Sequence, residues 1–225
     1  ASVDGDPAVK LSVARPRVET REPEEIIEQA VHKDPATGFY HRRRFLEVLT
    51  DRLDAKGGGV RVLAYIRPDK FRELEEQIGP LASEDVLVQF AEQLLSLAQP
   101  HDLCGRFGGQ VFTVFLERGN LRDVEAWTKS VIARIADRIF EIDHNTLSIT
   151  CTIGLAEVGP GTHRLEALVR GARQGVRDGR AKGGNRVFGG EDRSSGCFRL
   201  RYLRFGGAPL RRRPLVHLLP FVDGE

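Results

Sequence analysis

The most restrictive feature of this sequence is the run Val-Arg-Val-Leu-Ala-Tyr-Ile at residues 60–66, which directly follows three glycines. The run is short, apolar and rich in residues that favour strands. Such a run is typical of a strand that is buried in the middle of a sheet. A buried central strand needs helices over both faces of its sheet, so we expect a layered α/β protein.

The rest of the chain supplies segments for these layers. Helical periodicity predicts helices over residues 71–78, 86–98, 121–137 and 165–177, and an earlier one that carries Phe45, Leu46 and Leu49 on one side. Strand patterns occur at 104–107 and 111–117 around a Gly108-Gly109 turn, at 139–142, at 147–158 and near Val187. This order predicts an α/β (α+β) fold with a mixed five-stranded central sheet flanked by helices.

Composition excludes several protein classes. The chain has 225 residues, of which 40% are hydrophobic and 29% charged, which is enough for one folded domain of good size. No apolar run approaches the roughly 20 residues of a membrane span, and the N-terminus has no signal-peptide pattern. The three cysteines lack a disulfide or metal-ligand spacing. We expect a soluble cytoplasmic protein with no membrane and no nucleic-acid partner.

The net charge of +2 is unevenly distributed. Residues 193–225 carry +5, so the preceding part of the chain is mildly acidic. After Tyr202 the sequence becomes a mixture of Arg, Leu, Pro and Gly without helix or strand period. We interpret residues 191–225 as a basic irregular tail, produced by truncation or a reading-frame shift. The alternative is a natural basic arm that binds RNA or acidic lipid.

The N-terminal residues have the pattern of a connection to another domain. An Asp-Gly turn precedes alternating Val9, Leu11 and Val13, which predicts the end of a β-hairpin in residues 1–16. Residues 17–33 contain a helical pattern with acids in its first turn and His-Lys in its last, which favours a linker helix. The chain begins with Ala and contains no Met, so we expect it to be a piece of a longer protein.

Four motifs in order make the segment 34–190 resemble the GGDEF domain of diguanylate cyclases. They are DPATGFYHRRRF at 34–45, RFGGQVF at 106–112, ITCTIGLA at 149–156 and KGGNRVF at 182–188. The resemblance implies the nucleotide-cyclase (GGDEF-like) fold and a reaction that joins two GTP molecules into cyclic di-GMP. It also implies metal-binding acids at three positions, which match Arg67, Gln110 and Val111 here.

These replacements predict a degenerate domain with no catalytic residue and no metal, because divalent cations need carboxylate ligands. Asp69 is the one carboxylate left near this position. The resemblance further implies guanine-reading side chains at Glu75 and Glu84. The vestigial nucleotide site also takes in residues that match the phosphate-binding and hairpin positions of the family: Phe71, Arg72, Gly108, Gly109 and Arg180.

Two further family positions differ. Gly184 stands where a phosphate-binding Arg is expected, and the inhibitory R-x-x-D motif matches Gln99 to Asp102, without the Arg. The loss of the bidentate Arg predicts that the inhibitory site is lost. Arg42, Arg43 and Arg44 form a charge run at the start of a helix, which we interpret as a solvated face rather than a nucleotide site.

The chain is most similar to the GGDEF half of FimX-type pilus regulators, in which a PAS domain precedes and an EAL domain follows. The residues that carry this likeness are DPATGFYHRRRFLEVL, VLAYIRPDKF and the RFG-x-x-VF hairpin. The likeness implies that residues 1–16 end a PAS domain and that 191–225 begin an EAL domain. Implied partners are those PAS and EAL domains, a second copy of the chain, and a pilus or PilZ-type protein.

We therefore expect an inactive GGDEF-like module of a cyclic di-GMP pathway, which transmits signals, needs no cofactor and binds GTP weakly or not at all. One alternative is a residual diguanylate cyclase that uses Mg²⁺ with Asp69 and Gln110. Another is an allosteric GTP-binding domain that uses Glu84, Arg72 and Arg180.

Overall fold

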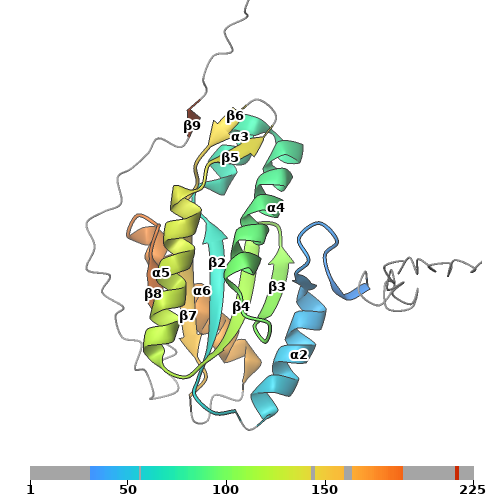
Figure 1. Ribbon diagram of the computed structural model, residues 1–225, viewed down its shortest axis with the longest axis vertical. Helices are drawn as coiled ribbons and strands as arrows, with labels where there is room; N and C mark the ends of the chain where they lie inside the picture. The colour runs from blue at the N-terminus through green and yellow to red at the C-terminus, as the bar shows by residue number, and fades with distance from the viewer. Residues whose placement is uncertain (1–30, 56, 143–144, 160–163, 190–215, 218–225) are drawn as a thin grey trace, which may run out of the picture.

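The central strand expected at residues 60–66 is β2 (Val60–Pro68) in the computed structural model of the chain. The structure describes residues 31–55, 57–142, 145–159, 164–189 and 216–217. β2 lies inside a six-stranded sheet with the order β1-β3-β4-β2-β7-β8 (Figure 1). The other strands are β1 (Tyr40–His41), β3 (Leu103–Gly108), β4 (Val111–Arg118), β7 (Cys151–Glu157) and β8 (Val187–Gly189).

The sheet is mixed, as expected. β2 pairs antiparallel with β4 and β7, and β3 pairs antiparallel with β4. The outer strands β1 and β8 pair parallel with β3 and β7. The five strands expected in the central sheet are present. The sixth is β1, whose two residues are too few to show a strand period in the sequence.

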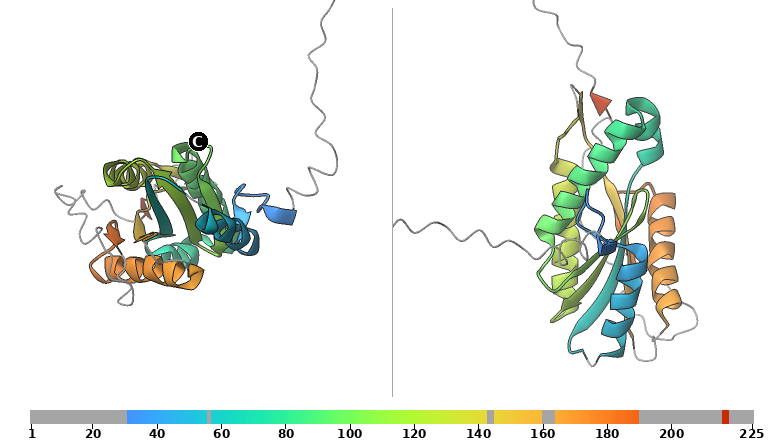
Figure 2. Two further views of the ribbon diagram at one scale, coloured as in Figure 1. Left: turned by 90° about the horizontal axis from the view of Figure 1, so that it is seen from below. Right: turned by 90° about the vertical axis from the view of Figure 1, so that its right-hand side faces the viewer.

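Helices cover both faces of the sheet (Figure 2). On one face lie α4 (Pro80–Leu97) and α5 (Leu121–Asp137), and on the other lie α2 (Arg42–Asp54) and α6 (Leu165–Ala181). The short helix α3 (Phe71–Ile78) follows β2. α3 and α5 have the expected bounds, whereas α4 begins six residues earlier than expected. Pro80 opens α4, because the fixed φ of proline suits the first turn of a helix.

The core is divided by the sheet into two apolar clusters. Val62, Ala64 and Ile66 of β2 pack in the cluster under α4 and α5. Leu63 and Tyr65 point to the other face and pack with residues of α2 and α6. Successive side chains of a strand alternate between faces, so an uninterrupted apolar run buries both. This alternation also places the side chain of the next odd-numbered residue, Arg67, on the α2–α6 face.

Two glycines allow the second helical layer to lie close to the sheet. A Cβ on Gly154 of β7 would collide with the backbone of α6 at Ala172, and a Cβ on Gly105 of β3 would collide with the ring of Phe45 from α2. Any larger residue at these two positions would push α6 or α2 away from the sheet.

A second, three-stranded sheet has the order β5-β6-β9. It consists of β5 (Phe140–Ile142), β6 (Asn145–Leu147) and β9 (Val216–His217). The single strand expected over 147–158 is therefore wrong in extent, because β6 and β7 are separate elements. The pairing of β9 with β6 was not expected, since the segment around Val216 has no strand period.

Several predictions fall on residues outside the described part of the chain. These are the hairpin in residues 1–16, most of the linker helix in 17–33, and all of the tail 191–225 apart from β9. Val31 and His32, which the structure does describe, are helical. Within the described residues, no helix is both long enough and apolar enough to span a membrane.

Candidate functional site

The candidate site begins at the hairpin between β3 and β4. Gly108 and Gly109 both have positive φ, 100° and 51°, a conformation that glycine adopts without strain. Gly108 pairs with Val111, so Gln110 lies at the tip of the turn. The hairpin carries two of the three replaced acidic positions, Gln110 and Val111, next to the end of β2.

Arg67 lies at the carboxyl end of β2, opposite Thr152 of β7. Its side chain is half-buried, and its Nε is buried with no hydrogen-bond partner among the described residues. Burial lowers the pKa of Arg67, and repulsion from Arg180 and Arg173 lowers it further. The guanidinium remains charged at neutral pH, because an arginine titrates far above that range. A fixed positive charge therefore occupies the expected metal position.

Gln110 and Val111 offer little to a cation. Val111 packs partly buried against the α2–α6 cluster. Gln110 has a buried Oε1 atom without a hydrogen-bond partner among the described residues. A neutral amide oxygen is a weaker ligand for Mg²⁺ or Ca²⁺ than a carboxylate.

Asp69 is buried and holds three segments of the chain together. Its Oδ1 accepts a hydrogen bond from Thr152 Oγ1 at 2.6 Å. Its Oδ2 accepts from Thr150 Oγ1 at 2.8 Å and from the backbone N–H of Asn185 at 2.7 Å. These donors fasten the end of β2 to β7 and to the loop after α6, so Asp69 acts as a structural acceptor.

A divalent cation does not fit these residues. Arg67 would repel it, Val111 cannot bind it, and both oxygens of Asp69 already accept hydrogen bonds. Within the described residues, no group of three or more His, Cys, Asp or Glu side chains is arranged to hold a metal ion.

Glu84 of α4 belongs to an ion-pair network rather than to an open pocket. Arg106 of β3 contacts Glu84 at 2.6 Å and Asp34 at 2.8 Å. Asp34 also accepts a hydrogen bond from Thr37 Oγ1. Burial raises the pKa of Asp34, but the hydrogen bonds from Thr37 and Arg106 outweigh it, and the net pKa lies below the ordinary value. The network joins the start of the domain to the hairpin strand and to α4.

The other expected nucleotide contacts are dispersed. Arg72 is exposed and pairs with Glu76 on its own helix at 3.1 Å. Glu75 is exposed, and Phe71 is a core residue that anchors α3. Arg180, at the end of α6, is close enough to Arg67 to lower its pKa. Of these side chains, only Arg180 thus acts on Arg67, the residue at the expected metal-binding position.

At the expected inhibitory site, the carboxylate of Asp102 is bound by an arginine of a neighbouring strand. Arg118 of β4 grips both carboxylate oxygens of Asp102, at 2.6 and 2.7 Å. The Asp102 side chain is fully buried, and the backbone N–H of Gln99 also donates to it. Asp102 therefore stabilises the fold and presents no free oxygen to a ligand.

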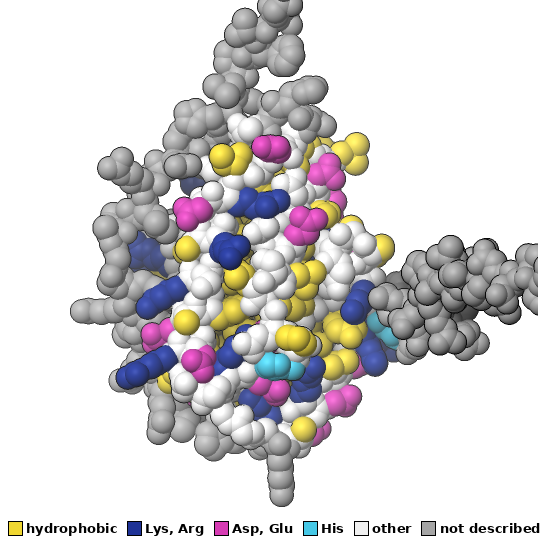
Figure 3. Space-filling model, in the orientation of Figure 1, with side chains coloured by type: hydrophobic (Ala, Val, Ile, Leu, Met, Phe, Trp, Pro, Cys, Tyr) yellow, Lys and Arg dark blue, Asp and Glu magenta, His cyan; other side chains and the backbone are white. Residues whose placement is uncertain are grey.

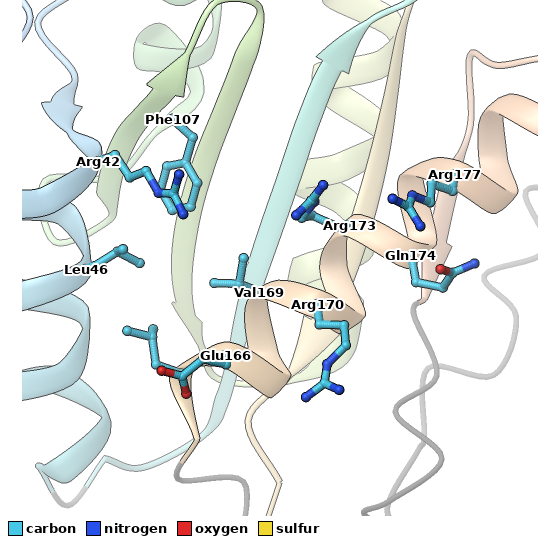
Figure 4. Close-up of a pocket in the computed structure, with 10 residues that line it drawn as sticks. Arg42, Leu46, Phe107, Glu166, Val169, Arg170, Arg173, Gln174 and Arg177 are labelled. Atoms are coloured by element: carbon cyan, nitrogen blue, oxygen red, sulfur yellow. The ribbon is translucent and has the colours of Figure 1, made fainter.

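Sequence reasoning missed an arginine-lined pocket between α2 and α6 (Figure 4). The signal was present, because Arg170, Arg173, Arg177 and Arg180 follow helical spacing and share one face of α6. Arg42, interpreted above as part of a solvated charge run, also lines this pocket.

Comparison with known proteins identifies this arrangement of elements. A family model described as "Diguanylate cyclase, GGDEF domain" matches residues 31–186. The chain belongs to the GGDEF domain family. Arg67, Gln110 and Val111 lie inside the residues that this family model matches.

Two similar proteins are a response regulator and a diguanylate cyclase. The response regulator PleD of Caulobacter vibrioides is 29% identical over 161 residues, which cover 69% of this chain and 35% of PleD. The chain thus spans about a third of the length of that relative. The diguanylate cyclase SiaD of Pseudomonas aeruginosa, solved with its activator SiaC, superposes with a TM-score of 0.66 at 27% identity, covering 73% of this chain and 64% of SiaD.

The solved GGDEF domain of FimX from Pseudomonas aeruginosa is also similar in fold. Its TM-score is 0.64 at 23% identity, and the match covers 69% of this chain and 98% of the FimX domain. At this identity the likeness establishes the shared fold. The expected GGDEF-like architecture is thereby confirmed.

Proposed function

We propose that this GGDEF domain makes no cyclic di-GMP and serves as a signal-transmission or interaction module in a cyclic di-GMP pathway protein. The observation that carries the proposal is the position of Arg67. It holds a positive charge at the end of β2, where the family's chemistry needs an acid for the metal. Because the phosphoryl transfer depends on cations that neutralise phosphate charge, a guanidinium in this place removes the metal-dependent route.

Transmission is supported by the contacts at the domain entrance. β1 pairs with β3, and Asp34 contacts Arg106 on the same strand. Arg106 in turn contacts Glu84 of α4. A conformational change in the segment that precedes residue 34 would thus act on β3 and on α4 together. A relay of this kind works when the domain has two arrangements whose populations a partner shifts.

We further propose that the domain belongs to a FimX-type protein, with PAS residues before it and an EAL domain after it. The support is the set of sequence motifs described above, since the structural likeness to FimX concerns the fold. In this architecture the domain boundaries are 1–16, 17–33, 34–190 and 191–225. The proposed role is regulation of type IV pili and twitching motility, through a pilus or PilZ-type partner.

The decisive experiment is an assay of GTP turnover. The protein is incubated with GTP and either Mg²⁺ or Mn²⁺, cyclic di-GMP is quantified by chromatography and mass spectrometry, and SiaD with SiaC serves as the positive control. We expect no product above the enzyme-free blank with either metal. Clear turnover that disappears on chelation would overturn the proposal and favour a residual cyclase.

Two observations count against the alternative functions. Asp69, needed for a residual cyclase, already accepts three hydrogen bonds. Glu84, needed for guanine recognition in an allosteric GTP site, contacts Arg106 at 2.6 Å. Calorimetry with GTP separates these readings, because saturable binding that Glu84→Ala abolishes would favour the allosteric site.

A further inference from the structure

A pocket of about 370 Å³ lies between α2 and α6 (Figure 4). Glu84, Arg106 and Asp34 are not among the residues that line it. α2 contributes Arg42 and Leu46, β3 contributes Phe107, and α6 contributes the remaining lining residues. Pockets of roughly 300 to 1,000 Å³ hold small organic ligands. The pocket is therefore large enough for a molecule rather than for water alone.

The charge of this pocket is strongly one-sided. Four arginines line it, Arg42, Arg170, Arg173 and Arg177, against the single acid Glu166. Within the described part of the chain, none of these four arginines forms an ion pair or a hydrogen bond. Neighbouring arginines outside the pocket do form ion pairs, among them Arg43 and Arg44 with Glu47.

The described residues on the opposite face have a mixed charge. Over α4 and α5, basic and acidic side chains are interspersed (Figure 3). The excess of positive charge in the pocket is thus a local feature of the α2–α6 face. Like charges held close together are unfavourable in the absence of an anion.

The pocket also has an apolar part. Phe107 packs edge-on against Tyr65 and Phe45, and the guanidinium of Arg42 lies 5.6 Å from the centre of the Phe107 ring. Leu46 and Val169 line the pocket as well. An aromatic ring beside a guanidinium plane suits stacking with a planar group of a ligand.

The positive charge extends from the pocket to the replaced metal position. Tyr65 packs edge-on against the pocket residue Phe107, and Arg42, Arg67 and Arg173 oppose the rise in its pKa that burial causes. Arg67 points to the same face as Tyr65, and its buried Nε has no partner among the described residues. A buried donor without a partner costs free energy that a ligand acceptor would recover.

We infer that this pocket binds a nucleotide-sized ligand that carries phosphate groups and a planar ring, and that it does so without a divalent cation. Guanidinium forks match phosphate oxygens in geometry and neutralise their charge directly. Phe107 and Arg42 hold the ring, while Arg173 and Arg67 hold the phosphates. The inference is independent of the proposed function, because a ligand here would bind whether or not the domain turned over GTP.

Calorimetry on the full chain tests the inference. GTP and inorganic pyrophosphate are titrated separately, in EDTA and about 0.15 M salt, where unspecific surface attraction is screened. We expect saturable GTP binding that Arg42→Gln combined with Arg173→Gln weakens about tenfold or more. Arg67→Gln weakens it several-fold.

Matched variants separate the pocket from general basicity. Arg122→Gln with Arg134→Gln removes two exposed charges from α5 and leaves the affinity within about twofold. Phe107→Leu weakens GTP and leaves pyrophosphate unchanged, which identifies the ring contact. Thermal unfolding confirms that each variant is folded.

Four outcomes would overturn the inference. They are the absence of saturable binding of GTP in EDTA, binding that requires Mg²⁺, equal effects of the pocket and α5 variants, and loss of GTP binding through Glu84→Ala alone. Synthesis of cyclic di-GMP would refute the proposed function and leave this inference standing, so the two failures are distinguishable.

Discussion

Gly184 lies directly against the carboxylate of Asp69. A Cβ at position 184 would stand 2.8 Å from the carboxyl carbon of Asp69, and Gly184 has a φ of 72°. This is also the position where the family resemblance implies a phosphate-binding arginine. The loop after α6 therefore leaves no room for a side chain at position 184. An arginine there would require the loop to move.

We expect Gly184→Arg to destabilise the domain by about 2–4 kcal/mol, because it adds both backbone strain and a collision with Asp69. Gly183→Arg is the matched control: its φ is also positive, at 103°, but a Cβ at this position would meet no atom within 4 Å among the described residues. Urea unfolding of both variants measures the difference. Equal stabilities would show that the contact with Asp69 has no energetic effect.

Asp69→Asn should lower the free energy of unfolding by about 2–4 kcal/mol, since an amide replaces one of two acceptor oxygens that face three donors. Asp85→Asn, on an exposed part of α4, is expected to change it by less than about 0.5 kcal/mol.

The unmodified protein and the Asp69→Asn variant together test for a cation at Asp69. We expect Mg²⁺ to leave the Tm of both unchanged, because neither oxygen of Asp69 is free. A rise in the Tm of the unmodified protein that Asp69→Asn removes would identify Asp69 as a metal ligand.

Arg118→Met should be among the most destabilising substitutions in the chain. It leaves the fully buried Asp102 without its bidentate partner, which costs about 3–5 kcal/mol. Adding Asp102→Asn removes the unpaired charge and should restore part of the loss. A double-mutant cycle from denaturant unfolding measures this coupling, and strictly additive effects would contradict a direct interaction.

The lowered pKa of Asp34 predicts that the stability of the domain depends on pH in the acidic range. Its folded-state pKa lies below the ordinary value of 3.8, so its ion pair contributes stability above that pH. This contribution is lost as the pH falls through the lower, folded-state pKa. Asp34→Asn should flatten the stability profile below about pH 4. A carboxyl titration by NMR that placed Asp34 at or above 3.8 would refute the assignment.

The sequence predicted five of the six strands of the central sheet, and it predicted α3 and α5 with their full bounds. The length and residue types of the apolar run in β2 favour a buried strand over other secondary structures. The helical periodicity of α5 is equally clear. β1 escaped prediction because its pairing with β3 depends on residues far apart in the chain. The start of α4 escaped because Pro80 and Leu81 lie on an exposed first turn, outside the apolar stripe.

The chemistry of the site was less predictable than its location. The motif alignment located Arg67, Gln110 and Val111, but the partners of Asp69 come from β7 and from the loop after α6. Likewise, the grip of Arg118 on Asp102 joins residues 16 positions apart on neighbouring segments. Side-chain pairings of this kind depend on tertiary packing, which single-residue patterns do not encode.

The pairing of β1 with β3 makes the entrance of this domain a mechanical coupling. Lys33 bridges to Tyr40, Tyr40 aligns with Gly105, and Asp34 is bonded to Arg106. These contacts link the start of the described domain directly to β3 of the hairpin. In the proposed transmission role, these contacts would carry a rotation upstream to the turn at Gly108 and Gly109.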